Sequence, residues 1–387
     1  MVKAIKVMLI PNNVQKTKMF QYAGASRFAY NWALAREIEN YEKGGKFISD
    51  AELRKEFTKL RHSDEYAWLL NISNNVTKQA IKDACTAYKN FFRGLQKFPR
   101  FKSKKRSMPK FYQDNVKIRF SNTHVKFEGF SSSRKANKQK KNWVRLAEHG
   151  RIPTDVKYMN PRISFDGLNW WISVCVEFPD CRETLNDDGV GIDLGIKDLA
   201  VCSDGTKYKN INKSQKVKKL EKQKRRLQRS ISRSYEKNKK GESYCKTNNV
   251  IKKEKLLLKR NHRLTNIRKN YLNQTISEII NRKPRFICIE DLNVSGMMKN
   301  RHLSKAVQEQ GFFWFRKQLE YRCSDKGIQL IVADRFYPSS KLCSCCGNIK
   351  KDLKLSDRVY RCACGNMIDR DFQASINLKT YGEKFAS

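Results

Sequence analysis

The chain has 387 residues, 39% of them hydrophobic, which is enough for two or three domains with their own cores and excludes a disordered tail. Lys and Arg number 81 against 38 Asp and Glu, so the formal net charge is +43. A compact protein tolerates such self-repulsion best beside a polyanion, and we therefore expect nucleic acid as the partner.

An anionic membrane surface is the alternative partner for so basic a chain. The sequence has no apolar run of the length that spans a bilayer, no signal peptide and no lipidation motif. Cysteines outside one C-terminal cluster show no paired spacing, which fits a reducing compartment. We expect a soluble, cytoplasmic protein.

The first hundred residues predict one strand followed by helices. Residues 1–10 have the pattern of a strand, and Asn12 or Asn13 is placed to cap the helix that follows. Helical patterns continue over 51–60 and 75–95. The aromatic and aliphatic face of the last segment has the spacing that packing requires, so we interpret it as core rather than as a ligand surface.

The region that follows is basic and then β-rich. In 98–105, cations including Arg100 and Lys102 alternate with aromatic residues, a composition that contacts phosphates and stacks bases. Short basic loops are also common on any protein of this charge. Short β-like runs over 110–178 predict a β-barrel-like module that the first strand completes, and the lysine-rich loop 131–142 within it is a candidate for nucleic-acid contact.

Two basic helices interrupt the C-terminal half. The segment 213–240 carries 13 Lys or Arg and 2 Glu around a narrow apolar stripe, and 251–281 is also basic and amphipathic. A solvated helix face is the ordinary interpretation, but this charge imbalance favours contact with a phosphate backbone. We expect an antiparallel helical hairpin joined by a loop that contains Gly241.

Acidic residues occupy unusual positions around this hairpin. Asp193 lies inside an apolar strand, where a carboxylate is costly unless it is paired or binds metal, and Glu290 and Asp291 end another apolar strand. Asp369 and Asp371 precede an amphipathic helix, which Asp369 alone can cap. Three acids from two strands and a helix, around two Mg²⁺ ions, would clamp a scissile phosphate from both sides.

Five of the twelve cysteines lie close together near the C-terminus. Cys343-x2-Cys346, fifteen residues, then Cys362-x-Cys364 has the spacing of two knuckles around one tetrahedral zinc ion. Free cysteines in a core are the alternative, which the polar, lysine-rich surroundings disfavour. The second pair is Cys-x-Cys rather than Cys-x2-Cys, and Cys345 is a spare thiol. We assign the other four cysteines as zinc ligands.

Four motifs in this order resemble the TnpB family, the RNA-guided DNA nucleases of bacterial insertion sequences and apparent ancestors of type V CRISPR effectors. The N-terminal ASRFAYNWAL and the FPRFKSKK stretch resemble the same family, so the resemblance covers almost the whole chain. The four motifs are GIDLGIKDLA (191–200), FICIEDLNVSGM (286–297), DRFYPSSKLCSCCG (334–347) and MIDRDFQASINL (367–378).

The resemblance implies a multidomain fold of the α+β and α/β classes. Its N-terminal part is a wedge-type β-barrel with a helical recognition insertion, and its C-terminal part is a RuvC-like nuclease of RNase H fold with an inserted zinc ribbon. The expected boundaries are 1–20 and 97–185 for the wedge, 21–96 for the insertion, 186–340 and 366–387 for the nuclease, and 341–365 for the ribbon.

The resemblance also implies roles for single residues. The three catalytic, Mg²⁺-binding acids are Asp193, Glu290 and Asp371, which leaves Asp369 as a structural neighbour. Gln373 stands where the family usually has Asn. None of these carboxylates is missing, so an active, Mg²⁺-dependent endonuclease with a structural Zn²⁺ is expected.

The same resemblance implies the place of action, at the nucleoid of a prokaryote, and the partners. Family members bind a guide RNA transcribed from the end of the transposon and read a short target-adjacent motif on double-stranded DNA, and we expect a monomeric ribonucleoprotein. Sequence choice otherwise rests on RNA–DNA pairing. The residues expected to read the motif, at the start of a helix whose Lys and Gln can contact base edges, are Ser73, Asn74, Lys78 and Gln79.

Three other functions remain open. One is a compact type V CRISPR effector, which only the neighbouring genomic DNA distinguishes from a transposon protein. Another is a nuclease-inactive, RNA-guided DNA-binding repressor, which the presence of all three acids disfavours. The last is an RNase H-fold nuclease or transposition accessory that uses no guide RNA.

Overall fold

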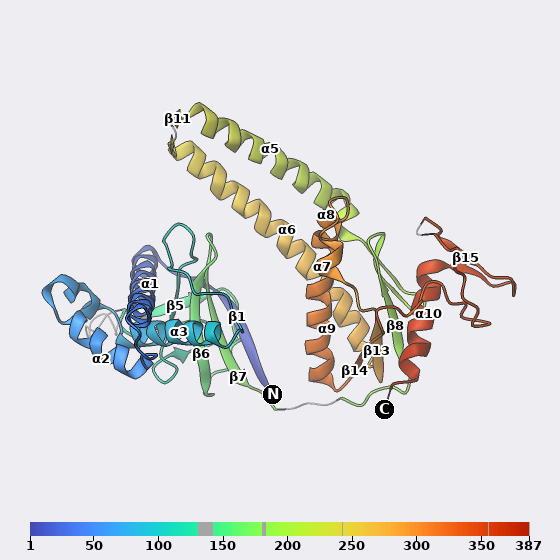
Figure 1. Cartoon of the computed structure of the whole chain (residues 1–387), viewed down its shortest axis with the longest axis horizontal. Helices are drawn as coiled ribbons and strands as arrows, with labels where there is room; N and C mark the ends of the chain where they lie inside the picture. The colour runs from blue at the N-terminus through green and yellow to red at the C-terminus, as the bar shows by residue number, and fades with distance from the viewer. Residues whose placement is uncertain (131–141, 180–182, 242, 355, 387) are drawn as a thin grey trace. The chain divides into compact units, whose positions relative to one another are not determined.

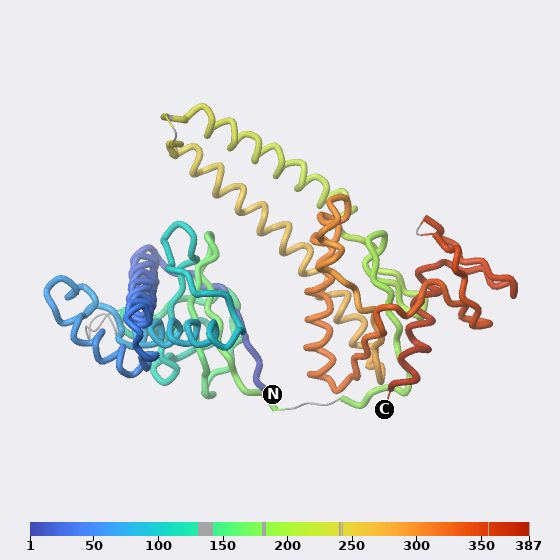
Figure 2. Tube along the Cα trace, in the orientation of Figure 1, coloured from blue at the N-terminus to red at the C-terminus, as the bar shows by residue number. Residues whose placement is uncertain are grey.

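A computed structural model of the protein divides into two compact units, Met1–Pro179 and Asp180–Ser387, which are considered separately (Figures 1 and 2). The lysine-rich loop predicted at 131–142 lies, except for its last residue, outside the described residues. The described residues are 1–130, 142–179, 183–241, 243–354 and 356–386.

The first unit contains a seven-stranded antiparallel sheet with the order β2-β6-β7-β1-β5-β4-β3. The strand predicted at the N-terminus is confirmed: it is central and pairs with β7 from Val2↔Glu177 to Leu9↔Trp170. The strands are β1 (Val2–Ile10), β2 (Lys110–Tyr112), β3 (Arg119–Phe120), β4 (His124–Lys126), β5 (Trp143–Leu146), β6 (Tyr158–Phe165) and β7 (Trp170–Glu177).

Helices of the first unit share one core with this sheet. The predicted cap is Asn12, which accepts a hydrogen bond from the Gln15 backbone while the Gln15 side chain accepts one from the Asn12 backbone. Such a capping box satisfies two backbone donors that a helix start otherwise leaves unpaired. The helices are α1 (Asn13–Glu42), α2 (Asp50–Arg61), the 3₁₀ helix η1 (Asp64–Asn71) and α3 (Asn74–Phe92).

A five-stranded sheet with the order β10-β9-β8-β13-β14 organises the second unit. Strand β9 is antiparallel to both of its neighbours, β10 and β8, whereas β8, β13 and β14 run parallel to one another. Parallel neighbours place their carboxyl ends at the same edge of the sheet. The strands are β8 (Val190–Leu194), β9 (Asp198–Cys202), β10 (Lys207–Lys209), β13 (Phe286–Ile289) and β14 (Gln329–Val332).

Helices cover both faces of this sheet. Ile287 and Ile289 of β13 belong to one core with residues of α6 and α9, whereas Phe286 and Cys288 belong to a second core with Leu378 of α10. This alternation explains why β13 is apolar at every position, as expected for a strand buried on both faces. The helices are α6 (Asn248–Asn281), α7 (Val294–Met297), α8 (Ser304–Gln310), α9 (Phe312–Lys326) and α10 (Arg370–Glu383).

The predicted basic hairpin is confirmed. Helix α5 (Gln215–Lys237), which follows the short η2 (Ile211–Lys213), packs along α6. Their far ends are joined through the small β11 (Lys239–Lys240) and β12 (Ser243–Tyr244), and both helices project away from the sheet of their own unit (Figure 1). Across the described ranges, no helix combines the length and apolarity that crossing a bilayer demands.

Close packing of α10 on β8 depends on Gly191, so replacing it by alanine is expected to destabilise the second unit by about 1–3 kcal/mol. A Cβ at this position would overlap with backbone atoms of Ser375 and Lys379, which cannot move without shifting α10. Thermal unfolding measures the effect. Gly24→Ala in α1 is the control, since nothing lies within 4 Å of that position. Equal unfolding temperatures for Gly191→Ala and the parent protein would contradict this packing.

Candidate functional site

Three carboxylates predicted from the sequence meet at the carboxyl edge of the parallel strands. Ile192 of β8 pairs with Ile289 of β13, so the next residues along the two strands, Asp193 and Glu290, occupy adjacent positions. Asp371 lies in the first turn of α10, which packs directly on β8. The structure therefore brings together three acids that are far apart in the sequence: Glu290 follows Asp193 by 97 residues, and Asp371 follows Glu290 by 81.

The electrostatics of this cluster are those of converging negative charges. Burial raises the pKa of the Asp193 carboxyl well above its usual value, and the charges of Glu290 and Asp371 raise it further. Arg370 donates to Asp371 at 3.1 Å. The Ser339 hydroxyl donates to Glu290 Oε1 at 3.2 Å. Several carboxylate oxygens in one place are the hard donor set that Mg²⁺ prefers, so the residues present fit that ion.

Neighbouring acids in the sequence have different partners. Asp291 accepts from Arg316 at 2.7 Å and from Arg335 at 2.5 Å, and these two guanidinium groups lower the pKa of its carboxyl. Asp369 accepts from the backbone N–H groups of Asp371 and Phe372 at 3.1 Å, which confirms its predicted role as the cap of α10. Contacts thus separate two structural acids from the three that converge.

Four cysteines form a cluster with the dimensions of a zinc site. The Sγ atoms of Cys343, Cys346, Cys362 and Cys364 all lie within 4.8 Å of one another. Two separations are 3.7 Å, for Cys343–Cys364, and 3.5 Å, for Cys346–Cys362. A tetrahedron with Zn–S bonds of about 2.3 Å has edges of about 3.8 Å. The Cys-x-Cys pair therefore reaches the same centre as the Cys-x2-Cys pair.

The backbone around the cluster is arranged for thiolates. Gly347 and Gly365, each directly after a cysteine pair, have φ of +73° and +88°, a conformation that favours glycine. Burial raises the pKa of the Cys343 thiol, but backbone N–H groups of Cys346 and the Asn366 amide outweigh burial and bring this pKa to about 6. Backbone N–H groups of Asn348 and Asn366 lower the pKa of the Cys346 and Cys364 thiols, but the neighbouring cysteine side chains outweigh them and raise both pKa values, that of Cys364 to about 12. Cys343, whose thiol ionises easily, is therefore the cysteine best prepared to bind a metal ion.

Ribbon and carboxylate cluster are directly connected. The ribbon strands β15 (Val359–Arg361) and β16 (Met367–Asp369) pair antiparallel, and β16 ends at the residue that caps α10. Helix α10 also binds the loop that enters the ribbon: Asn377 Nδ2 donates to the carbonyl oxygens of Ser339 and Leu342, both at 2.7 Å. The loop that carries the Ser339 hydroxyl to Glu290 is thereby fixed to the helix that carries Asp371.

Gln373, the departure from the family pattern, is fully buried within this connection. Its Nε2 donates to the Leu342 carbonyl at 2.7 Å, and its Oε1 accepts from Ser344 at 2.9 Å and from Asn366 at 3.2 Å. Asn366 in turn donates to Cys343 Sγ at 3.4 Å. Ser339 and Asn377 were not singled out from the sequence, although both lie inside motifs that were.

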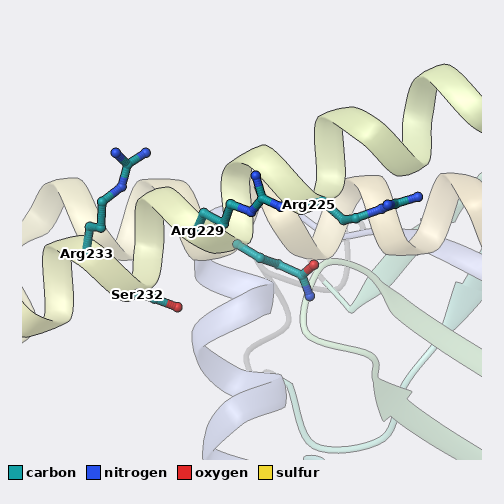
Figure 3. A pocket seen from close by; sticks show the side chains of 5 residues that line it. Arg225, Arg229, Ser232 and Arg233 are labelled. Carbon is teal, nitrogen blue, oxygen red and sulfur yellow. The ribbon is translucent and has the colours of Figure 1, made fainter.

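Arginines form a row along the basic hairpin. Arg225, Arg229 and Arg233 follow one another at intervals of four residues on α5, and all three are exposed. Figure 3 shows these side chains and that of Ser232 extending from the helix, and together with Gln228 they line one pocket. Residues four apart share one helix face, so the row presents three guanidinium groups in a line about 12 Å long, a form suited to a phosphate backbone.

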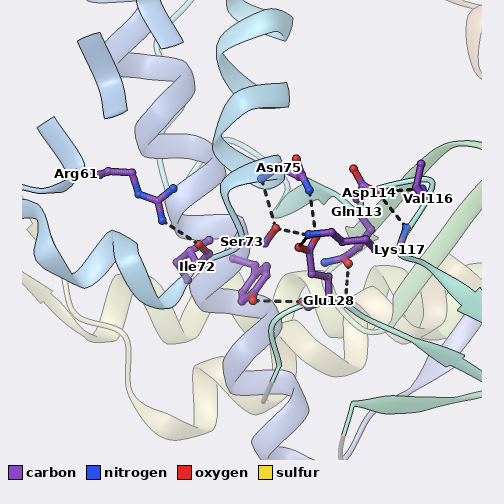
Figure 4. Close-up of polar contacts among 10 residues, drawn as sticks. Arg61, Ile72, Ser73, Asn75, Gln113, Asp114, Val116, Lys117 and Glu128 are labelled. Carbon is purple, nitrogen blue, oxygen red and sulfur yellow. Dashed lines mark hydrogen bonds and ion pairs between the residues drawn. The ribbon is translucent and has the colours of Figure 1, made fainter. Parts of the chain in front are cut away.

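The predicted motif-reading residues lie at the start of α3. Ser73 caps this helix, and its hydroxyl donates to Glu128 at 2.9 Å (Figure 4). Glu128 also accepts from Asn75 at 3.2 Å and from Lys117 at 2.5 Å. Of the other predicted residues at this helix start, Asn74 is half-buried and Lys78 is exposed.

Asp83, which the sequence did not single out, organises the remaining predicted contacts. Gln79 donates to Asp83 at 2.9 Å, and Arg162 donates to both its oxygens at 2.5 and 3.0 Å. Lys102 lies over the Tyr30 ring, with Nζ 3.0 Å from the ring centroid. Burial lowers the pKa of Lys102 to about 7, so it is a weaker cation than the sequence predicts.

Arg100 is exposed and follows a segment that contributes to an exposed surface of aromatic and basic residues. Tyr41 and Phe92 have ring centroids 5.4 Å apart, and these side chains are 59% and 54% exposed. Phe98, 44% exposed, extends the cluster through Phe91. The exposed cations in the same segments are Lys43, Lys46, Arg93, Lys97 and Arg100.

Family models match three parts of the chain. A "Helix-turn-helix domain" of insertion-sequence proteins matches residues 1–46, a "Probable transposase" matches 173–301, and a "Cas12f1-like, TNB domain" matches 312–378. The last two ranges contain Asp193, Glu290, Asp371 and the four clustered cysteines. These matches define a protein of the insertion-sequence class that shares a domain type with Cas12f1.

Relatives extend the match over nearly the whole chain. An Escherichia coli protein named "Putative RNA-guided DNA endonuclease InsQ" is 31% identical over 379 residues, covering 93% of this chain and 87% of the relative. A Streptomyces pristinaespiralis protein named "Putative RNA-guided DNA endonuclease" is 28% identical, covering 98% and 89%. The chain belongs to the TnpB family.

The fold also matches a solved effector complex. The protein chain in "Cryo-EM structure of the Cas12f1-sgRNA-target DNA complex" aligns with a TM-score of 0.62 at 12% identity, covering 98% of both chains. A mixed α and β fold of the Cas12f type is therefore shared at low sequence identity.

Proposed function

We propose that this protein is an RNA-guided DNA endonuclease encoded by an insertion sequence. The observation that carries the proposal is the convergence of Asp193, Glu290 and Asp371 at the carboxyl edge of one sheet, in a chain whose relatives are named RNA-guided DNA endonucleases. Two strands and one helix contribute one acid each, and a hydrolase that cuts a phosphodiester needs no side-chain nucleophile when such a cluster binds metal.

The residues in and around the carboxylate cluster have different proposed roles. Asp193, Glu290 and Asp371 would hold two Mg²⁺ ions, which supply an activated water and neutralise the leaving oxygen in an in-line displacement. Asp193, whose carboxyl interacts with those of both Glu290 and Asp371, anchors the set. Arg370 limits the freedom of Asp371, and Ser339 orients Glu290 through its hydroxyl. Fixed carboxylates bind metal without rearranging during the reaction.

The strand order β10-β9-β8-β13-β14, antiparallel then parallel, supports a RuvC-like nuclease of RNase H fold in the second unit. For the first unit, the antiparallel sheet with helices α1 to α3 after its first strand supports a wedge-type barrel with a helical recognition insertion. We retain the boundaries expected from the sequence, except that the zinc ribbon expected at 341–365 extends to Asp369, because β16 pairs with β15.

The ribbon has a structural and a positioning role in this proposal. Cys343, Cys346, Cys362 and Cys364 would bind one structural Zn²⁺. Bonds from Asn377 and Gln373 then tie the loop 338–342 to α10, which places Ser339 against Glu290. Ser339 is a positioning residue, since it acts through Glu290.

Guide RNA and double-stranded target DNA are the proposed partners of a monomeric ribonucleoprotein. The arginine row of α5 and the exposed aromatic and basic surface around Phe92 support contact with phosphates and unpaired bases. Ser73, Asn74, Lys78 and Gln79 remain the candidates for reading a target-adjacent motif, with Arg100 and Lys102 near the following loop.

Purification of the protein with its RNA, followed by a plasmid-cleavage assay with randomised flanking sequence, tests this function. One abundant structured RNA should copurify, and cleavage should depend on a match between that RNA and the plasmid and on Mg²⁺. A guide-independent nuclease would instead cut without RNA. Target binding without cleavage at any Mg²⁺ concentration would establish the repressor.

A further inference from the structure

A cavity of about 290 Å³ lies beside the carboxylate cluster, and Glu290 itself forms part of its wall. Most of the remaining wall is apolar and includes Leu292 and Phe312. At the rim, Phe313 is 64% exposed although its neighbour Phe312 is 2% exposed. An aromatic ring that is not needed for the core is thus presented at the cavity next to the proposed metal site.

Two arginines complete the rim with fixed positive charge. Arg316, one turn after Phe313 on α9, donates to Asp291 at 2.7 Å and to Glu320 at 3.1 Å, and Arg335 donates to the other oxygen of Asp291 at 2.5 Å. Both arginines line the cavity, and their side chains are 34% and 51% exposed. Asp291 therefore fixes two guanidinium groups at the rim of the cavity, and within the described residues Arg335 contacts no second carboxylate.

We infer that this cavity accepts the base of the DNA nucleotide next to the scissile phosphate. A nucleobase is flat and apolar on its faces, polar at its edge and attached to an anionic backbone, which matches the Phe313 ring, the apolar wall and the arginine rim. Because Glu290 borders both places, a backbone phosphate at the metal site brings its own base to the cavity. This inference rests on the proposed function and extends it.

The cavity makes unpaired DNA the substrate of the cutting step. A base in a duplex is stacked and paired, so it enters a pocket only after it leaves the stack. Once the base is bound, the position of its phosphate relative to Glu290 is set, and the cut falls at a fixed distance from the unwound junction. Guanidinium groups of Arg316 and Arg335 reinforce this by attracting the flanking phosphates.

A cycle of protein and substrate changes tests the inference on the complete ribonucleoprotein. A series of target DNAs carries a single abasic site, which is placed at successive nucleotides on either side of the cut. We expect about a tenfold loss of cleavage rate at one position, and the same loss for Phe313→Ala on intact DNA. The two changes combined should reduce the cleavage rate no more than either change alone, because both remove the same stacking contact between Phe313 and the base. Additive losses at every position would overturn the inference.

Controls separate this result from a folding defect or a failure of the nuclease proposal. Tyr321→Ala changes another exposed aromatic residue of α9, 41% exposed, and should retain the parent response to abasic sites. Independently of cleavage, 2-aminopurine at the sensitive position should be quenched in the Asp193→Ala ribonucleoprotein and not after Phe313→Ala is added. If 2-aminopurine in the guide RNA were quenched in a Phe313-dependent way and 2-aminopurine in the DNA were not, the assignment to DNA would be overturned. Absence of cleavage by the parent protein would contradict only the nuclease proposal.

Discussion

Replacing Asp193 by alanine is expected to reduce DNA cleavage by roughly a thousandfold or more, because the acid that interacts with both others is lost, and with it a proposed metal ligand. Binding of RNA and of target DNA should remain, since we expect these partners to bind mainly through the basic surfaces of the protein. Cleavage of a matched plasmid and gel-shift titration of the same preparation measure the two quantities side by side.

A pair of adjacent acids provides the matched control. Glu290→Gln should lose cleavage as Asp193→Ala does. Asp291→Asn should cost no more than about tenfold, because Asp291 contacts Arg316 and Arg335 at the rim of the cavity rather than the proposed metal site. The two substitutions remove the same charge one residue apart. If Asp291→Asn were the inactive variant and Glu290→Gln the active one, the assignment of the metal ligand would be reversed.

Replacing Cys346 by serine is expected to abolish stoichiometric zinc and to reduce cleavage by about tenfold or more, with a smaller effect on RNA binding. A structural zinc site contributes folding energy directly, so its loss unfolds the ribbon. The loop 338–342 leads into the ribbon and is bound to α10 at that point. Unfolding of the ribbon therefore releases this loop, and Ser339 loses its fixed position against Glu290. Residual cleavage should consequently require more Mg²⁺, which a Mg²⁺ titration of the rate measures.

Cys345→Ser is the control for this experiment. Cys345 is the adjacent, exposed thiol outside the four-cysteine cluster, so zinc content by elemental analysis and cleavage should both stay at the parent level. Loss of zinc from Cys345→Ser would show that the spare thiol, rather than one of the assigned four, is the ligand. If Cys346→Ser reduced RNA binding more than cleavage, the ribbon would be a general folding element.

Local patterns were enough to predict the elements that carry the site. An acid inside an apolar strand, as Asp193 is, and another at the end of one, as Glu290 is, are visible because a buried carboxylate needs a compensating partner. The cap at Asp369 and the capping box at Asn12 follow from rules that involve only three or four neighbouring residues. The basic hairpin was predictable because apolar residues recur at helical spacing through both 213–240 and 251–281.

Contacts between distant segments were beyond such patterns. Asn377 reaches the Ser339 carbonyl across 38 residues, and no local rule pairs a helix amide with a loop that precedes a ribbon. Gln373 was visible only as a departure from the family, whereas the structure gives its amide three partners. The charge of Lys102 was overestimated for the same reason, because its burial over Tyr30 depends on the folded first unit.

The direct passage from β16 into α10 restricts how the ribbon can vary. Asp369 is the last residue of the strand and the cap of the helix, so the junction to Asp371 has no spare residue. One added residue there would turn the start of the helix by about 100° and carry Asp371 away from Asp193. The outer turns of the ribbon have no such constraint. We therefore expect chain length at the tip to vary among such nucleases and the spacing from Asp369 to Asp371 to stay fixed.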